Sequence, residues 1–300
     1  MHRSILLIAL SIRLTAADLD TARQTGFSQV PIRLAHGFAP VAPVWVGGEG
    51  PFDFLIDTGT NTVLIDPDLA KRFPSRAQSA MMLDSLNGST RVSAMTLPSL
   101  RIGEETVSHV EAIVNNLDGV HRLSARIRGV IGINILRQFS FEIDYEKSRL
   151  ALWKPGTLPP PVIGAVIPAV TEGDRIVVPF FSAAARNGHW NLALDSGIRQ
   201  PLIFREQLMP AARDDGATSL LSTNAAQTSA RTLHLEELQG AGVRWSNVTA
   251  LSIAGQTSPQ NGLEDGLFPA CAFAAVRFEL AAEHMVLVPR GLITSSACSP

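Results

Sequence analysis

The chain has 300 residues, of which 17% are charged, and its net charge at pH 7 is −2. So small a charge gives no electrostatic reason to expect binding to nucleic acid or to an anionic membrane. A chain of this length buries roughly 75% of its unfolded surface, so its core needs no metal or disulfide for support. Many short Val, Ile, Leu and Phe runs among 19 prolines and 23 glycines indicate an all-β protein with few short helices.

Residues 1–17 are predicted to be a signal peptide. A basic start is followed by an apolar segment over residues 4–12 and by small residues at 15–17 that suit cleavage. Arg13 shortens the apolar segment, and a disordered or strand-forming start is the alternative. We expect export to the periplasm or out of the cell. No other apolar run reaches the ~18 residues that cross a bilayer, so no stable membrane span is expected in the mature chain.

The rest of the chain reads as short strands separated by turns. In chain order, strands are predicted over residues 42–46, 52–56, 90–97, 100–102 and 107–114, short helices after Pro67 and over residues 133–138, and a hairpin over residues 141–152. Prolines at 155 and 159–161 then mark a linker. These features divide the mature chain into a first segment, 18–154, a Pro-rich linker, 155–164, and a second segment, 165–300.

The first segment is organised around Asp57. This acid follows the apolar strand at residues 52–56 and precedes Thr58 and Gly59. A lone charge at the end of a core strand costs several kcal/mol, so another group must offset that cost. The same pattern of apolar residues, acid, hydroxyl and glycine returns at residues 192–197, 138 residues later.

Apolar landmarks repeat together with the two acids. Leu100 follows the first acid by 43 residues, and Leu238 follows the second by 43. Gly129 and Gly266 follow their acids by 72 and 71 residues, and similar triplets that begin at residues 141 and 278 follow by 84 and 83. We interpret this repeat as two related lobes of about 130 residues each.

Two related lobes can bring Asp57 and Asp195 face to face about an approximate two-fold axis. Carboxylates within hydrogen-bond reach cannot both ionise cheaply, so they share one proton. Such a pair can hold a water. The ionised acid takes a proton from this water as it attacks a carbonyl, and the protonated acid donates to the developing oxyanion.

These motifs resemble the aspartic proteases, both the two-lobed pepsin-like group and the single-lobed retropepsin-like group. The resemblance implies two related retropepsin-like β-barrel lobes with a pseudo-two-fold axis and a central cleft. It also implies a water-activating pair with supporting residues and a mobile hairpin, the flap, that closes over a bound peptide. The implied residues are Asp57 and Asp195 as catalytic; Thr58, Gly59, Thr60, Ser196 and Gly197 as supporting; and Asn87, Gly88 and Ser89 in the flap, with residues 224–228 as the second lobe's equivalent.

The second lobe departs from the family pattern. It reads Leu267-Phe268-Pro269 where a glycine is expected, and Ile198 stands where the first lobe has Thr60. The single tyrosine, Tyr145, lies in the late hairpin and not in the flap. The first lobe therefore matches the family better than the second.

The expected function is aspartic endopeptidase activity on a peptide or protein substrate, by a monomer without cofactor or metal. One alternative is a catalytically inactive peptide- or protein-binding module of the same fold. Another is a glycosidase, whose two carboxyls would stand ~5 Å or more apart. Cys271 and Cys298 are either a disulfide or two separate thiols, and the sequence leaves both possibilities open.

Overall fold

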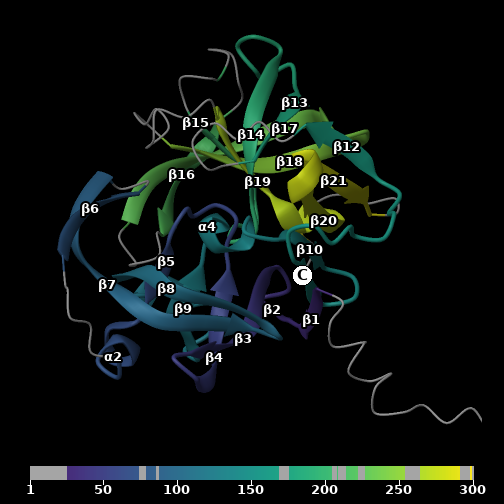
Figure 1. Ribbon diagram of the computed structural model, residues 1–300. Coiled ribbons are helices and arrows are strands. Elements are labelled where there is room, and N and C mark those ends of the chain that lie inside the picture. Colours follow the sequence, from purple (N-terminus) through teal and green to yellow (C-terminus); the bar gives the residue numbers. More distant parts are fainter. Residues whose placement is uncertain are drawn as a thin grey trace, which may run out of the picture.

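The computed structural model is built almost entirely of β-strands, with a few single-turn helices (Figure 1). It describes residues 26–73, 79–85, 88–168, 176–204, 208, 214–221, 227–253, 264–290 and 298. The predicted signal peptide, residues 1–17, lies outside these ranges. The strands form three sheets of eight, seven and six strands. The all-β prediction is therefore confirmed.

The first lobe is an eight-stranded sheet with the order β2-β3-β4-β9-β5-β8-β7-β6. Its strands are β2 (Arg33–Ala35), β3 (Ala39–Val46), β4 (Glu49–Ile56), β5 (Val63–Ile65), β6 (Ser79–Ser85), β7 (Gly88–Ile102), β8 (Glu105–Val114) and β9 (Ile127–Ile131). Three helices accompany them, α2 (Pro67–Ala70), α3 (Asp118–His121) and α4 (Ile133–Leu136). Because β3 also pairs with β7, the sheet curls back on itself as a barrel does.

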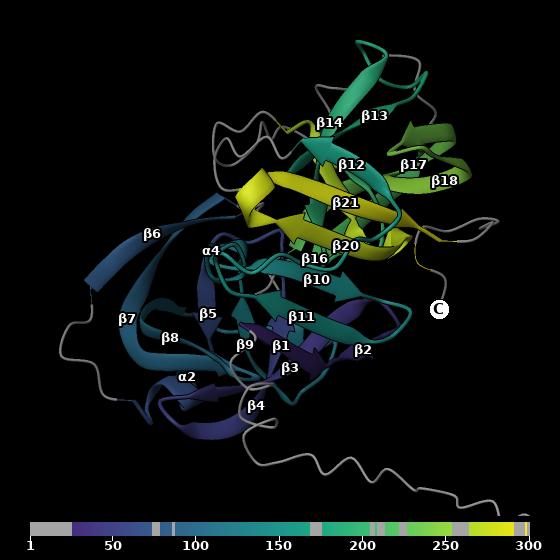
Figure 2. The same cartoon turned by 45° about the vertical axis from the view of Figure 1, so that its right-hand side comes forward.

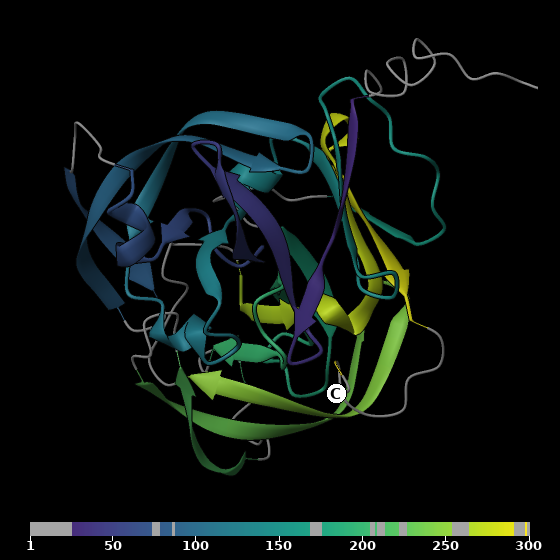
Figure 3. The same ribbon diagram turned by 90° about the horizontal axis from the view of Figure 1, so that it is seen from below.

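The second lobe is a seven-stranded sheet with the order β13-β14-β19-β15-β18-β17-β16. Its strands are β13 (Val177–Phe181), β14 (His189–Asp195), β15 (Leu202–Phe204), β16 (Asp214–Leu221), β17 (Gln227–Gly240), β18 (Val243–Ile253) and β19 (Gly266–Pro269). Here β13 also pairs with β17, and β14 runs parallel to β19 just as β4 runs parallel to β9. The two lobes therefore share one topology. Seen from below, the blue strands of the first lobe and the long green strands of the second lie on opposite sides (Figure 3).

A third sheet joins the lobes (Figure 2). Its order is β1-β11-β10-β20-β21-β12, with β1 (Phe27–Pro31), β10 (Ser140–Asp144), β11 (Arg149–Trp153), β12 (Ala165–Pro168), β20 (Phe273–Glu279) and β21 (His284–Pro289). The predicted hairpin over residues 141–152 is confirmed as β10 and β11. Its central role was not predicted: β10 pairs antiparallel with β20 of the other half, placing Phe141 opposite Phe278.

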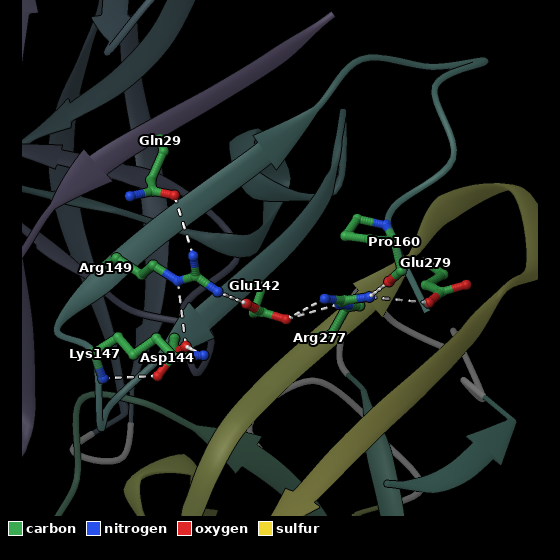
Figure 4. A network of polar contacts seen from close by, with 8 residues as sticks. All are labelled: Gln29, Glu142, Asp144, Lys147, Arg149, Pro160, Arg277 and Glu279. Atoms are coloured by element: carbon green, nitrogen blue, oxygen red, sulfur yellow. Dashed lines mark hydrogen bonds and ion pairs between the residues drawn. The ribbon is translucent and has the colours of Figure 1, made fainter. Parts of the chain in front are cut away.

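A buried ion-pair network crosses this central pairing (Figure 4). Glu142 and Arg277 face each other in register and are 2% and 3% exposed. Arg277 Nε donates to Glu142 Oε2 at 2.8 Å, while Arg149 donates to Glu142 Oε1 at 3.2 Å. Arg277 also donates to the carbonyl of Pro160 in the linker. The pairing of β10 with β20, the ion pair of Glu142 and Arg277, and the contact of Arg277 with the linker all hold the two halves together.

The two cysteines pair in the structure. Cys271 and Cys298 form a disulfide with a Cα–Cα distance of 5.8 Å across 27 residues of chain. On the loop-entropy model such a link stabilises the fold by roughly 3 kcal/mol. Cys271 lies in a single-turn 3-10 helix, η3 (Ala270–Ala272), between β19 and β20; a second, η4 (Leu280–Ala282), follows β20. The disulfide therefore links the end of the chain to the segment that follows the second lobe's central strand.

Within the ranges above, no helix has the length and apolar character that a bilayer crossing requires.

Candidate active site

Asp57 lies immediately after β4, at the end of the first lobe's central parallel pair. Phe54, Leu55 and Ile56 are buried, and they carry the backbone inward beside β9. The Asp57 amide donates to the carbonyl of Ile131 at 2.9 Å, which extends the β4–β9 ladder to the acid itself. The acid is only 8% exposed. The apolar strand β4 therefore ends with the Asp57 carboxylate at the edge of the core, as the sequence indicated.

Asp195 occupies the equivalent place in the second lobe. It is the last residue of β14, it lies beside Pro269 of the parallel strand β19, and it is 6% exposed. The turn after each acid has the same geometry: Gly59 N donates to Asp57 Oδ1 at 2.9 Å and Gly197 N donates to Asp195 Oδ1 at 2.7 Å. Each carboxylate is thus held by a backbone donor two residues further along its own loop.

Four hydrogen bonds join the two acid loops through Thr58 and Ser196. The Thr58 hydroxyl donates to Leu194 O at 2.8 Å, and the Ser196 hydroxyl donates to Ile56 O at 2.7 Å. In return each hydroxyl accepts from the other loop's amide, Ser196 N at 3.1 Å and Thr58 N at 3.0 Å. The arrangement is reciprocal, as expected of an approximate two-fold axis. It is buried, so these bonds fix the relative position of the two acids.

The glycines of the two loops lie against the opposing acids. A Cβ placed on Gly197 would meet the Asp57 carboxyl carbon at 3.0 Å, and one placed on Gly59 would overlap the Asp195 carboxylate more severely. Any side chain at either position would push the carboxylates apart. The structure therefore brings both predicted acids, both hydroxyls and both glycines into one cluster.

The segments that support the two loops differ between the lobes. In the first lobe Ile133 N, at the start of α4, donates to Thr60 O at 2.8 Å. In the second lobe η3 replaces that helix, and Cys271 Sγ lies 3.8 Å from Ile198 O. Pro269 does not disrupt its strand, since β19 keeps its parallel register with β14. The contacts described for Thr60 are made by its backbone, so the hydroxyl role predicted for it stays a prediction.

The predicted flap corresponds to the hairpin of β6 and β7. Gly88 pairs with Ser85 and Ser89 pairs with Asp84, while Asn87 lies outside the described residues. In the second lobe β16 and β17 form the matching hairpin, and residues 222–226 at its tip are also outside the described ranges. The hairpins are present where the sequence indicated, and their role in binding a substrate stays a prediction.

Tyr145 is a residue near the site that the sequence interpretation missed. It follows β10 directly, and its amide donates to Ala274 O at 2.9 Å, so it lies at the junction of the lobes. Burial raises the pKa of its phenol, and the negative charge of Asp195 raises it further. The only signal in the sequence was that a single tyrosine stands beside the acidic end of a predicted strand.

Metal binding finds no support in the described part of the chain, where no three His, Cys, Asp or Glu side chains converge.

Valine in place of Thr58 is expected to lower the free energy of unfolding by about 1–3 kcal/mol. The substitution keeps the side-chain shape but leaves Ser196 N without its acceptor and Leu194 O without its donor. Urea unfolding of the full chain measures the change. Thr58→Ser is the matched control, because it retains the hydroxyl. If both variants unfold at the same urea concentration, the hydroxyl does not hold the loops together.

Comparison with known proteins gives one family match. Residues 42–135 match the family model described as aspartyl protease. A search of curated proteins finds no match. Among solved structures, a retropepsin-like aspartic protease from Rickettsia conorii is 21% identical, with a TM-score of 0.33, and the match covers 43% of this chain and 91% of that protein. The family match runs from β3 to α4 and includes the Asp57 loop. In motif and in sequence, residues 42–135 of the N-terminal lobe are thus similar to the aspartyl protease family.

Proposed function

We propose that this chain is an aspartic endopeptidase that hydrolyses peptide bonds between its two lobes. The observation that carries the proposal is the reciprocal set of hydrogen bonds between the acid loops. These bonds hold two buried carboxylates against each other's glycines. A fold that only needed stability would not pair two acids in this way, because each buried carboxylate disfavours ionisation of the other.

The proposed chemistry follows from that pairing. Asp57 and Asp195 share one proton and hold a water between them. As the water attacks the scissile carbonyl, the ionised carboxylate accepts its proton, and the protonated carboxyl donates to the developing oxyanion. The donated proton then reaches the leaving amine. Aspartic proteases are the usual example of two acids that share a proton in this way.

The supporting residues position the pair. Thr58 and Ser196 keep the loops in register, and Gly59 and Gly197 permit their close approach, so little rearrangement is needed during the reaction. We further propose that the hairpin with Gly88 and Ser89 covers an extended peptide and adds main-chain hydrogen bonds to it.

We also propose that the protein is exported and acts as a monomer. The disulfide between Cys271 and Cys298 supports export, because disulfides persist in oxidising compartments. The monomer is supported by the presence of two acid loops in one chain. A single copy then contains both halves of the proposed site.

A catalytically inactive peptide-binding module is the second candidate. It is favoured by the asymmetry of the second lobe, where Ile198 replaces a hydroxyl residue and η3 replaces a helix. In that case the lobes would still bind an extended segment, but no bond would be cleaved.

The test is cleavage of a mixed peptide library across a range of pH. The unmodified chain is compared with Asp57→Asn and with Asp118→Asn, a control at an exposed acid of α3. We expect internal cleavage by the unmodified chain and the control, and none by Asp57→Asn. Peptide binding without cleavage by the unmodified chain would favour the inactive module. Equal cleavage by all three proteins would rule out the proposed chemistry.

A further inference from the structure

The second lobe carries a disulfide at the place where the first lobe carries a helix. Strand pairing makes Gly129 and Gly266 equivalent, because each pairs with the residue three positions before the acid of its lobe. Five residues further along, the first lobe has Asn134 in α4 and the second has Cys271 in η3. Cys271 is bonded to Cys298. The disulfide therefore stands beside the second acid loop, in the position of α4.

Both α4 and η3 contact the acid loop of their lobe at the same backbone carbonyl, three residues after the acid. In the first lobe Ile133 N donates to Thr60 O at 2.8 Å. In the second lobe Cys271 Sγ lies 3.8 Å from Ile198 O. A disulfide sulfur carries no hydrogen, so this contact holds the loop by packing and not by a hydrogen bond. The position of the second acid loop therefore depends on how firmly η3 itself is held.

Two attachments from the C-terminal part of the chain hold η3. The disulfide links Cys271, which is fully buried, to Cys298, which is 7% exposed, across 27 residues of chain. Arg290, directly after β21, adds a second attachment, because its Nε donates to Cys271 O at 3.0 Å and to Phe273 O at 3.1 Å. The chain beyond β21 thus fixes the segment that packs against the second acid loop.

We propose that the disulfide between Cys271 and Cys298 positions the second acid loop through η3, so that the proposed site is fully formed only in the oxidised chain. The inference deepens the proposed function and rests on it. Pro269 pairs with Asp195 and directly precedes η3, so a shift of η3 reaches the acid through the strand as well as through Ile198. In a reducing compartment both cysteines stay thiols. The second acid would then be held less firmly until the chain reaches oxidising surroundings.

Amide hydrogen exchange tests this role without any substrate. Gly197 N and Gly59 N each donate to the acid of their own loop, so the first lobe is an internal reference for the second. In the double variant Cys271→Ala, Cys298→Ala, we expect protection of the Gly197 amide to fall about tenfold relative to that of Gly59, because only the second loop opens more often. A loss of overall stability lowers both amides together. A ratio equal to that of the unmodified chain would overturn the proposal.

Arg290→Met provides a second variant in case the double variant does not fold. It keeps the disulfide and removes the donor to Cys271 O and Phe273 O. We expect the ratio of Gly197 to Gly59 protection to fall about threefold, as suits the loss of hydrogen bonds to neutral carbonyls. Arg244→Met, at an exposed arginine of β18, is the matched control and should leave the ratio unchanged. Without a folded double variant, an unchanged ratio in Arg290→Met overturns the proposal.

Steady-state kinetics connect the loop to the proposed reaction. Because the loop carries one of the two acids, we expect the double variant to lose about tenfold in kcat, with KM changed by about twofold or less. Leu117→Ala is the matched control: a cavity at this buried residue before α3 lowers stability but should leave kcat unchanged. An unchanged kcat in the folded double variant would overturn the proposal. If the unmodified chain cleaves no peptide, the proposed function fails, yet the exchange ratio still decides whether the disulfide holds the loop.

Discussion

Asparagine in place of Asp195 is expected to abolish peptide cleavage, lowering kcat/KM by at least about a thousandfold while the fold remains intact. Asparagine has nearly the shape of aspartate, so Gly197 N keeps an oxygen acceptor. The pair, however, loses one of its two titrating groups and can no longer share a proton. The measurement is steady-state cleavage of a peptide found in the library, together with thermal unfolding to confirm that the variant is folded.

This variant is the most informative one because the second lobe departs from the family pattern. Glu236→Gln, at an exposed acid on β17, is the matched control and should retain full activity. Full activity of Asp195→Asn combined with an inactive Asp57→Asn would mean that the first lobe acts without the second. In that case cleavage should also depend on protein concentration, as it would if two first lobes had to associate.

Methionine in place of Glu142 is expected to lower the free energy of unfolding by about 3–5 kcal/mol. Glu142 lies between Arg277 and Arg149 in the interlobe sheet (Figure 4). Without it, the guanidinium of Arg277 stays buried, and its remaining charged partner is Glu279 at 3.8 Å. The loss of a counter-charge at a buried site is far more costly than the loss of one at the surface. Equilibrium unfolding in urea measures the change.

Two controls separate this effect from ordinary loss of a side chain. Glu142→Met combined with Arg277→Met should recover most of the lost stability, because no buried charge is then left unpaired. The exposed pair of Arg244 and Glu237, 2.9 Å apart on β18 and β17, gives the surface comparison. Arg244→Met should cost about 1 kcal/mol or less. A similar small loss for Glu142→Met would show that the buried pair does not hold the lobes together.

Where sequence and structure differ within one lobe, local chemistry explains the difference. Separate strands were predicted over residues 90–97 and 100–102, on either side of Pro98, a residue that lacks an amide donor. In the structure β7 runs unbroken from Gly88 to Ile102. β7 pairs with β8 on both sides of this proline, Leu97 with Val110 and Ser99 with Ser108. His109, which lies between these two partners on β8, adopts a left-handed φ of 54°. The backbone of β8 therefore departs from extended geometry opposite the proline, and β7 continues through it.

The strand-rich class, the two acid loops and their repeated spacing could all be predicted from the residue pattern. These features are local: an apolar run that ends in an acid, a hydroxyl and a glycine needs only its own residues to define a buried strand and a tight turn. The order of landmarks along each lobe then predicted that the two acids would meet. Both loops do come together, linked by Thr58 and Ser196.

The way the lobes are joined could not be predicted, because it depends on contacts between segments that are far apart in the chain. The pairing of β10 with β20, the contact of Glu142 with Arg277 across 135 residues, the disulfide and the position of Tyr145 have no local signature. An antiparallel strand can pair with many others of similar apolar pattern, and its partner is selected by packing of the whole chain. Residues that act between the lobes therefore became visible only when both lobes were in place.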